Sequence, residues 1–175
     1  MLKELISWLK ALVIALIIVF VVRKFIITPS IVKGDSMQPN LYDGDRIIIS
    51  KVSSIDRFDE IAFVAPNGHD NYVKRVIGMP GDRIEINNDV LYINGEVYEE
   101  FYLTNLQEGE VVIDYFDLEK WHGYEEVPEG TYFVLGDNRR YSYDSRDFGV
   151  ITEESVIGEV VLRIWPLDSI GVIKH

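Results

Sequence analysis

The sequence predicts a mainly β protein, in which one N-terminal transmembrane helix precedes a β domain that carries a smaller inserted β subdomain. Three observations support this prediction. Leu5–Val22 is nearly continuous apolar sequence, and after Pro39 the chain breaks into short runs rich in β-branched residues. Gly-Asp, Pro-Gly-Asp and Asn-Gly pairs separate those runs and are typical of turns. Helix outside the N-terminal segment is therefore expected to be scarce.

The composition narrows the class of protein. The chain has 175 residues, of which 47% are hydrophobic and 12% aromatic, so we expect one anchored domain with a packed core. Its formal net charge of −12 argues against nucleic acid as a partner, because binding phosphate requires clustered Lys and Arg. The chain has no cysteine, which excludes disulfides, thiolate nucleophiles and Cys-based metal sites.

Leu5–Val22 has nearly the length of a membrane span, since about 20 apolar residues cross the hydrocarbon of a bilayer. The following "VVRKFIITPS" is bulky and basic and lacks the small residues of a signal-peptide cleavage site. We therefore predict an uncleaved anchor within residues 1–24. Its orientation is not set by charge, because basic residues flank both ends: Lys3, Lys10, Arg23 and Lys24.

The remaining chain reads as strands and turns. Residues 90–98, "VLYINGEVY", form the clearest hairpin, with Asn94-Gly95 between two alternating runs. Residues 83–128 are acidic and aromatic with weaker periodicity, and we predict that they form the inserted β subdomain. Residues 25–82 and 129–175 would then form the main β domain. Its strands and the first strand of the insertion are expected at 46–51, 61–65, 72–78, 83–86, 131–136 and 156–166.

Ser36 lies in "GDSMQP", close after the anchor, and can act as a nucleophile only if a neighbouring group accepts its proton. None of the three histidines, His69, His122 and His175, lies beside a Gly-rich or strand-end motif, so each is expected to be solvated. The segment also departs from the G-x-S-x-G pattern, because Gln38 takes the last place. A Ser-His-Asp triad stays open but has little support.

Lys74 is a second candidate for the base. On a strand, Tyr72 and Lys74 share one face and Val73 and Arg75 the other, and both faces are otherwise apolar. One of the two adjacent cations must therefore lie against buried surface. Arginine stays protonated in proteins, whereas burial can lower the pKa of a lysine far enough for it to act as a base. The alternative is that the stem of Lys74 covers the sheet while its amine stays in water.

The segment 135–149, "LGDNRRYSYDSRDFG", is more polar than a simple turn requires. A hydroxyl of Ser142 or Ser145 could hydrogen-bond a lysine amine and hold it in place. Asp144 and Arg146 are two residues apart and could form an ion pair. The alternative is a solvated turn region.

Together these segments resemble the type I signal peptidases, membrane-bound Ser/Lys endopeptidases that trim exported preproteins. Residues 36–41 resemble the family's S-M-x-P-T-L box and depart from it only at Asn40. Residues 74–82 match its K-R-V-x-G-x-P-G-D box, and residues 136–149 its G-D-N-x-x-x-S-x-D-S-R-x-x-G box. The resemblance covers the anchor and nearly all of residues 25–166, and it implies a coiled antiparallel β-sheet as the catalytic domain. Lysine rather than histidine at position 74 resembles the bacterial type.

The resemblance implies a role for each matched residue. Some members carry a serine two places before the nucleophile that donates to the oxyanion; here that place is Gly34, as in the single-anchor form typical of Gram-positive bacteria. The second oxyanion donor is therefore unassigned. The implied roles are nucleophile and backbone N–H oxyanion donor for Ser36, general base for Lys74, orientation of the lysine for Ser142, support of this region for Asp144 and Arg146, and the substrate cleft for Met37 and Tyr72.

The implied function is the removal of N-terminal signal peptides from exported preproteins, with cleavage after small residues in an A-x-A pattern. The substrate would add as a strand beside residues 29–35 and 72–74. No cofactor or metal is expected, and the expected partners are secretory preproteins and the lipid bilayer, without nucleic acid. The resemblance places the protein in the cell membrane as a single-pass protein, with its N-terminus in the cytoplasm and its catalytic domain on the exported side.

Two rival interpretations share some of these features. One is a Ser/Lys peptidase with another client, such as a self-cleaving repressor or a processing enzyme for a conjugation protein. The other is a membrane-tethered β module that binds peptides without cutting them, which would have no need for Ser36 and Lys74 together.

Overall fold

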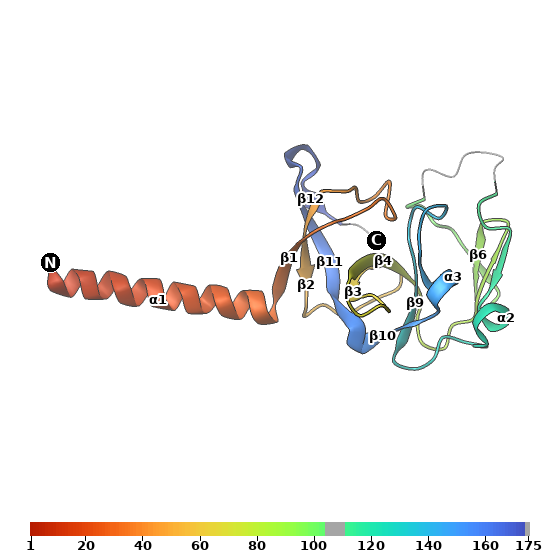
Figure 1. Cartoon of the computed structure of the whole chain (residues 1–175), viewed down its shortest axis with the longest axis horizontal. Coiled ribbons are helices and arrows are strands. Elements are labelled where there is room, and N and C mark those ends of the chain that lie inside the picture. The colour runs from red at the N-terminus through yellow and green to blue at the C-terminus, as the bar shows by residue number, and fades with distance from the viewer. Residues whose placement is uncertain (104–110, 174–175) are drawn as a thin grey trace.

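The chain folds into one long N-terminal helix and two antiparallel β-sheets, and the expected mainly β fold class is confirmed (Figure 1). The computed structural model describes residues 1–103 and 111–173. Outside the N-terminal helix, the described residues form only two short α-helices, α2 (Leu118–His122) and α3 (Ser145–Phe148), and two single-turn 3₁₀ helices. Helix is thus as scarce as the turn-rich sequence predicts.

The N-terminal helix α1 (Leu2–Phe25) projects away from the β domain and includes the predicted span (Figure 1). Its 24 residues are about 36 Å long at 1.5 Å per residue. An 18-residue window within Lys3–Phe25 has a mean hydropathy of 2.8, and none of that window is buried against the rest of the chain. By length and composition, α1 can therefore cross a membrane. It ends at Ile26, whose N–H donates to the Val22 carbonyl, and the chain then enters the first strand directly.

The larger sheet contains eight strands and lies between α1 and the smaller sheet (Figure 1). Its order is β1-β2-β11-β3-β4-β9-β10, and β12 pairs with β11. The bounds are β1 Ile27–Ile31, β2 Arg46–Ser50, β3 Glu60–Val64, β4 Asn71–Gly78, β9 Thr131–Leu135, β10 Ile151–Thr152, β11 Val156–Trp165 and β12 Gly171–Val172. Each strand that the sequence predicts in this sheet begins within one residue of its expected start.

The smaller sheet contains four strands in the order β7-β6-β5-β8. The hairpin at Asn94-Gly95 is confirmed: both residues have positive φ, 56° and 81°, and Ile93 pairs with Glu96 across the turn. The bounds are β5 Ile84–Asn87, β6 Val90–Ile93, β7 Glu96–Tyr98 and β8 Tyr115–Asp117, all within the predicted insertion.

The two sheets share a hydrophobic cluster. Ile77 of β4 and Phe133 of β9 are fully buried in the same cluster as Ile86 of β5 and Phe116 of β8. Burying a large apolar side chain contributes about 1.5–3 kcal/mol, so this shared cluster holds the smaller sheet against the larger one. The division into an anchor (1–24), a main domain (25–82 and 129–175) and an inserted subdomain (83–128) stays a prediction.

Candidate active site

The loop between β1 and β2 holds Ser36 at the edge of the core. At the base of the loop, the Val32 N–H donates to the Asp45 carbonyl over 2.9 Å. Met37 and Leu41, which are 1% and 0% exposed, anchor the loop in the hydrophobic cluster beneath β2 and β11. Because Met37 and Leu41 are packed in the core, they restrict the position of Ser36 from within its own loop.

Ser36 and Lys74 are in direct contact. Nζ of Lys74, on β4, lies 2.5 Å from Oγ of Ser36, and the lysine is only 3% exposed. The same Nζ lies 5.5 Å from the centre of the Tyr72 ring. The alternative in which the Lys74 amine stays in water is therefore wrong.

Burial lowers the pKa of Lys74 from 10.5 to about 8. The negative charges of Asp144 and Asp137 act in the opposite direction, and the positive charge of Arg146 lowers the pKa further. At neutral pH a usable fraction of this amine is therefore uncharged, and a neutral amine 2.5 Å from a hydroxyl can accept its proton.

Arg75, next to Lys74 in sequence, is also buried, at 1% exposed. The sequence predicted that at least one of the two adjacent cations is buried, and the structure buries both. Arg75 donates through Nε and Nη2 to both carboxylate oxygens of Asp137, at 2.9 and 2.6 Å, and through Nη2 to Glu60 at 2.7 Å. Its guanidinium also lies 4.1 Å from the centre of the Tyr102 ring. A buried cation with this set of partners stays charged and serves as a structural link.

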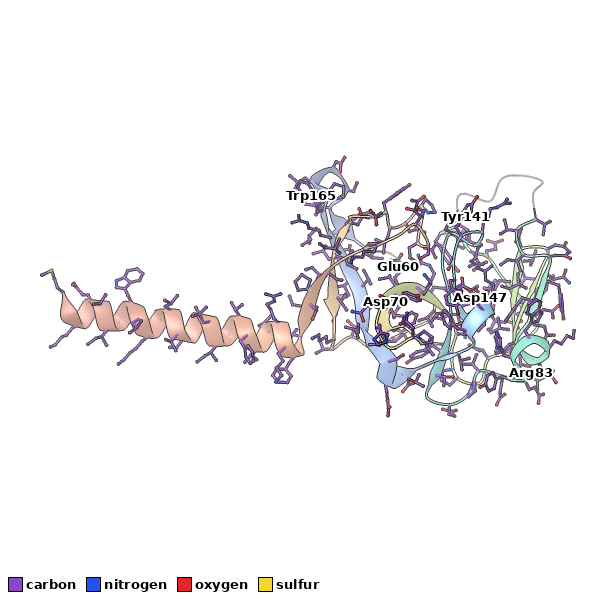
Figure 2. The ribbon with its side chains drawn as sticks, in the orientation of Figure 1. Glu60, Asp70, Arg83, Tyr141, Asp147 and Trp165 are labelled. Carbon is purple, nitrogen blue, oxygen red and sulfur yellow. The ribbon has the colours of Figure 1, made fainter. Side chains whose placement is uncertain are left out.

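Burial raises the pKa of Glu60 from 4.5 to about 7, although the adjacent Arg75 acts in the opposite direction. Its second oxygen, Oε2, is buried without a hydrogen-bond partner among the described residues. Glu60 lies in the interior of the domain (Figure 2).

Asn40 ties the Ser36 loop to this buried arginine. Its Nδ2 donates to Oδ2 of Asp137 over 2.8 Å and to the Tyr102 carbonyl over 3.0 Å. The sequence marked Asn40 only as the departure from the S-M-x-P-T-L box, and it gave no sign of these two long-range bonds. A threonine has a single hydroxyl proton and could make only one of these two donations.

Asp144 and Arg146 form the ion pair that their spacing suggested. Nε and Nη2 of Arg146 donate to the two carboxylate oxygens of Asp144 over 2.8 and 2.9 Å. Asp144 also caps α3 and accepts the Gly136 N–H over 3.0 Å. Arg146 in turn donates to the Arg139 and Ser142 carbonyls, so this pair fixes the backbone of the loop that follows β9.

The two serines of this loop differ in their contacts. Oγ of Ser145 is fully buried and accepts the Val134 N–H over 2.9 Å, and the described contacts of Lys74 do not include it. Oγ of Ser142 is buried and has no hydrogen-bond partner among the described residues. The role of Ser142 in orienting Lys74 therefore stays a prediction.

Gly136 leaves the space that brings this loop against the nucleophile. A Cβ at position 136 would lie 2.1 Å from Oγ of Ser142 and 2.5 Å from the Ser36 carbonyl oxygen. Two residues later, the Asn138 N–H donates to the Ser36 carbonyl over 3.0 Å, and Nδ2 of Asn138 donates to the Asp35 carbonyl. The loop that carries Ser142 is thus bonded to the backbone of Ser36.

A cleft of about 780 Å³ opens over the Ser36–Lys74 pair, and Met37 and Tyr72 are among its lining residues. Two backbone edges border it. Among the described residues, β1 pairs only with β2, and residues 71–74 of β4 pair only with β3, because pairing with β9 begins at Arg75. An extended peptide can therefore hydrogen-bond to either edge.

The histidines do not form a triad with Ser36 among the described contacts. His69 lines the cleft, but its recorded hydrogen bond joins its backbone N–H to Asn67. The expectation that His122 is solvated is wrong: it is half-buried, and its Nε2 lies 3.1 Å from the Arg146 carbonyl oxygen. His175 lies outside the described residues. In residues 1–103 and 111–173, no group of three or more His, Asp or Glu side chains is arranged to hold a metal ion.

Comparisons with known proteins agree on one family. Residues 5–165 match the family described as "Signal peptidase, peptidase S26". Signal peptidase IB from Staphylococcus aureus strain Mu50 is 42% identical over 178 residues, which cover 95% of this chain and 93% of that protein. Signal peptidase I from Bacillus caldolyticus is 44% identical over 161 residues, 87% of each chain.

A solved structure is also similar to this chain. The crystal structure of a signal peptidase I from Enterococcus faecalis V583 has a TM-score of 0.58 and 43% sequence identity. The match covers 62% of this chain and 98% of that one.

Lys74 should titrate near pH 8 rather than above pH 10, because burial opposes its charge. We expect Asp144→Asn to lower this midpoint further, since it removes a negative charge that favours the ammonium. NMR titration of the lysine side chains in the detergent-solubilised chain measures both values. Asp168→Asn, on an exposed turn, is the matched control and should leave the midpoint unchanged. A midpoint above 10 in the wild-type chain would contradict the role of burial.

Gly136→Ala should slow acylation of Ser36 by a serine-directed reagent roughly tenfold or more, because the new Cβ must displace Ser142 or the Ser36 backbone. Labelling rates measured by mass spectrometry give the result, and circular dichroism checks that the variant is folded. Gly171→Ala is the control, since a Cβ there meets nothing within 4 Å. Labelling of Gly136→Ala at the wild-type rate would show that this close approach is not needed.

Proposed function

The chain belongs to the signal peptidase family, peptidase S26, and from this premise we propose that Ser36 and Lys74 are its catalytic residues. The protein is a serine endopeptidase that removes N-terminal signal peptides from exported preproteins. The observation that carries the residue assignment is the 2.5 Å contact between Oγ of Ser36 and Nζ of a buried lysine. A membrane-tethered module that only binds peptides would not need this contact.

In the proposed mechanism, Oγ of Ser36 attacks the carbonyl carbon of the residue before the cut while Nζ of Lys74 takes the hydroxyl proton. The tetrahedral intermediate collapses as the protonated Lys74 gives that proton to the leaving amine, and the mature chain departs. A water molecule then attacks the acyl-enzyme while Nζ of Lys74 takes one of its protons. As the bond between the acyl group and Oγ of Ser36 breaks, Lys74 gives this proton to Oγ and restores the serine hydroxyl. The signal peptide leaves as a carboxylic acid, which loses its proton to solvent. Each half-reaction returns Lys74 to its neutral form.

The lowered pKa of Lys74 supports this role. With a pKa of about 8, roughly one lysine in ten is neutral at pH 7, whereas at the ordinary value of 10.5 only about one in 3,000 would be. Burial therefore raises the concentration of the active base by more than two orders of magnitude. The amine still remains basic enough to take a proton from a serine hydroxyl as the hydroxyl attacks.

Ser142, Asp144 and Arg146 are proposed to position this pair. The bidentate bond between Asp144 and Arg146 fixes the loop, and Asp144 also acts electrostatically on Lys74. The unpaired hydroxyl of Ser142 lies beside Gly136, against which the Ser36 carbonyl also packs. In this proposal, the Ser142 hydroxyl donates to the neutral amine of Lys74 and restricts its motion.

The oxyanion that forms on the substrate carbonyl is proposed to accept a hydrogen bond from the Ser36 backbone N–H. Gly34 has no side chain to offer a second bond, and its own N–H donates to Oδ1 of Asp43 over 2.8 Å. One oxyanion donor is worth about 3 kcal/mol in comparable sites, so a second donor from the backbone or water would contribute substantially.

The preprotein is proposed to bind as an extended strand between the unpaired edges of residues 29–35 and 71–74. Backbone hydrogen bonds to these edges would supply affinity for many sequences. Met37, at the floor of the cleft, and Tyr72, on its wall, would limit the size of side chains that enter. Shallow apolar pockets of this kind fit the preference for small residues at the first and third positions before the cut.

We also propose that the protein crosses the cell membrane once, with its N-terminus in the cytoplasm and the β domain on the exported side. The bilayer is the proposed partner of α1, and no nucleic-acid partner is proposed. Only Ile26 separates α1 from β1, whose Thr28, Ser30 and Ile31 line the cleft. The cleft therefore lies within a few residues of the membrane surface, where a signal peptide emerges.

Ser36→Ala and Lys74→Ala should each abolish cleavage of a preprotein while leaving the protein folded, since each removes one half of the proton transfer. Lys74→Arg should fail equally, because a guanidinium keeps the charge but cannot accept a proton. The measurement is incubation of the detergent-solubilised chain with a preprotein, followed by sequencing of the new amino terminus.

His69→Ala is the control for the histidine alternative, and we expect it to keep the turnover rate. Near-normal turnover by Lys74→Arg would rule out proton abstraction by this side chain. Loss of turnover in His69→Ala would instead favour a Ser-His mechanism.

A further inference from the structure

We propose that Tyr141 and Tyr143 form a subsite for the first residues of the mature chain, and that it favours large apolar or aromatic side chains there. The inference rests on the proposed function, because it assigns a specificity to the same cleft. Both tyrosines line the cleft that contains Ser36 and Lys74, and they are 74% and 59% exposed. Two rings this exposed, one on each side of Ser142, offer a large contact surface to a ligand.

The backbone that carries the two rings is held in place before any substrate binds. The Tyr141 N–H donates to the Asn138 carbonyl over 3.0 Å, and the Ser142 and Arg139 carbonyls both accept from Nη2 of Arg146. Binding to a fixed loop costs less conformational entropy than binding to a mobile one. These tyrosines therefore resemble the rigid aromatic contacts that dominate binding sites.

The Tyr143 ring is also supported from the core. It packs edge-on against Phe148, with ring centres 5.4 Å apart and planes at 66°. Phe148 lies 6.5 Å from Phe63, which in turn packs edge-on against Tyr72 in the cleft wall. This row of rings fixes Tyr143 relative to the cleft while leaving more than half of its surface open.

The two rings differ from the rest of the cleft in how they can hold a peptide. Residues of β1 and the first half of β4 offer unpaired backbone, which suits the stretch before the cut. In the loop after β9, the Asn138 N–H and the Arg139 and Ser142 carbonyls are already bonded within the protein. At this end the loop therefore recognises a peptide mainly through side chains.

The direction of the chain places the mature residues at this end. The apolar part of a signal peptide precedes the cut and stays at the membrane, while the mature chain leads away from it. Tyr141 lies on the side of the β domain farther from α1 than β1 is (Figure 2). A peptide that passes β1, reaches Ser36 and continues away from the bilayer then meets Tyr141 and Tyr143 with its first mature residues.

The test uses the detergent-solubilised full chain and peptides that are identical up to an A-x-A cut. The peptides carry Ala, Leu or Phe at the first or the second position after it. The measured quantity is the ratio of kcat/KM for the Phe or Leu peptide to that for the Ala peptide. Tyr141→Ser, Tyr143→Ser and the double variant remove the rings, and the corresponding Tyr→Phe variants keep them. Tyr124→Ser is the matched control, because Tyr124 is exposed and is not among the residues that line the cleft.

We expect the wild-type chain to prefer Phe or Leu by about tenfold. The double Ser variant should bring the ratio close to one through an increase in KM, while both Phe variants and Tyr124→Ser keep the wild-type ratio. A wild-type ratio of one, or a ratio that survives the double Ser variant, would overturn the subsite. So would a loss of selectivity seen only for residues before the cut. A wild-type chain that cuts none of the peptides would contradict the proposed function itself, and the subsite with it.

Discussion

The structure depends on one unfavourable placement, the burial of a primary amine beside a serine hydroxyl. Removing Lys74 from water disfavours its charged form, and the fields of Asp144 and Asp137 partly offset that cost. The net result is a pKa near 8 for Lys74. An amine of much higher pKa would keep its proton at neutral pH, and an amine of much lower pKa would be too weak a base to take the serine proton. Carboxylates in direct contact with Nζ would hold it as an ammonium. The contact it makes instead is the Ser36 hydroxyl.

Lys74 and Arg75, two adjacent cations on β4, show that the partners of a buried side chain decide whether it stays charged. Arg75 is as buried as Lys74, but Asp137 and Glu60 satisfy its guanidinium, so it stays charged and joins strands. Asn40 joins the Ser36 loop to this link through Asp137, and it joins the same loop to the segment after β7 through the Tyr102 carbonyl. Nucleophile and base thus stand on separate segments whose spacing is set by one buried ion pair.

The sequence predicted the strands and turns, because these depend on residues close together in the chain. Alternating β-branched runs placed the strands, and Asn94-Gly95 fixed a hairpin turn because both residues tolerate positive φ. The sequence boxes at residues 36–41 and 74–82 identified Ser36 and Lys74 as candidate catalytic residues. A strand period assigns residues to faces but does not say which faces are covered. The burial of both cations could therefore be seen only in the structure, where Lys74 contacts Ser36 of the loop between β1 and β2 and Arg75 contacts Asp137 of the loop after β9. The bonds of Asn40 and His122 were missed because their partners lie at least 24 positions away in the sequence.

The anchor and the cleft are parts of one continuous segment, because β1 follows α1 after a single residue and is itself an edge of the larger sheet. An edge strand normally exposes unpaired backbone and invites aggregation. Here that edge faces the cleft, so the same unpaired groups are available to a peptide strand. With α1 across the bilayer, as we propose, the helix sets the height of β1 above the membrane and with it the height of the cleft that β1 lines. In this proposed arrangement, a substrate held in the same bilayer needs to search only in the plane of the membrane. The residues just before its cut then lie along the free edge of β1, and its first mature residues lie at the loop after β9.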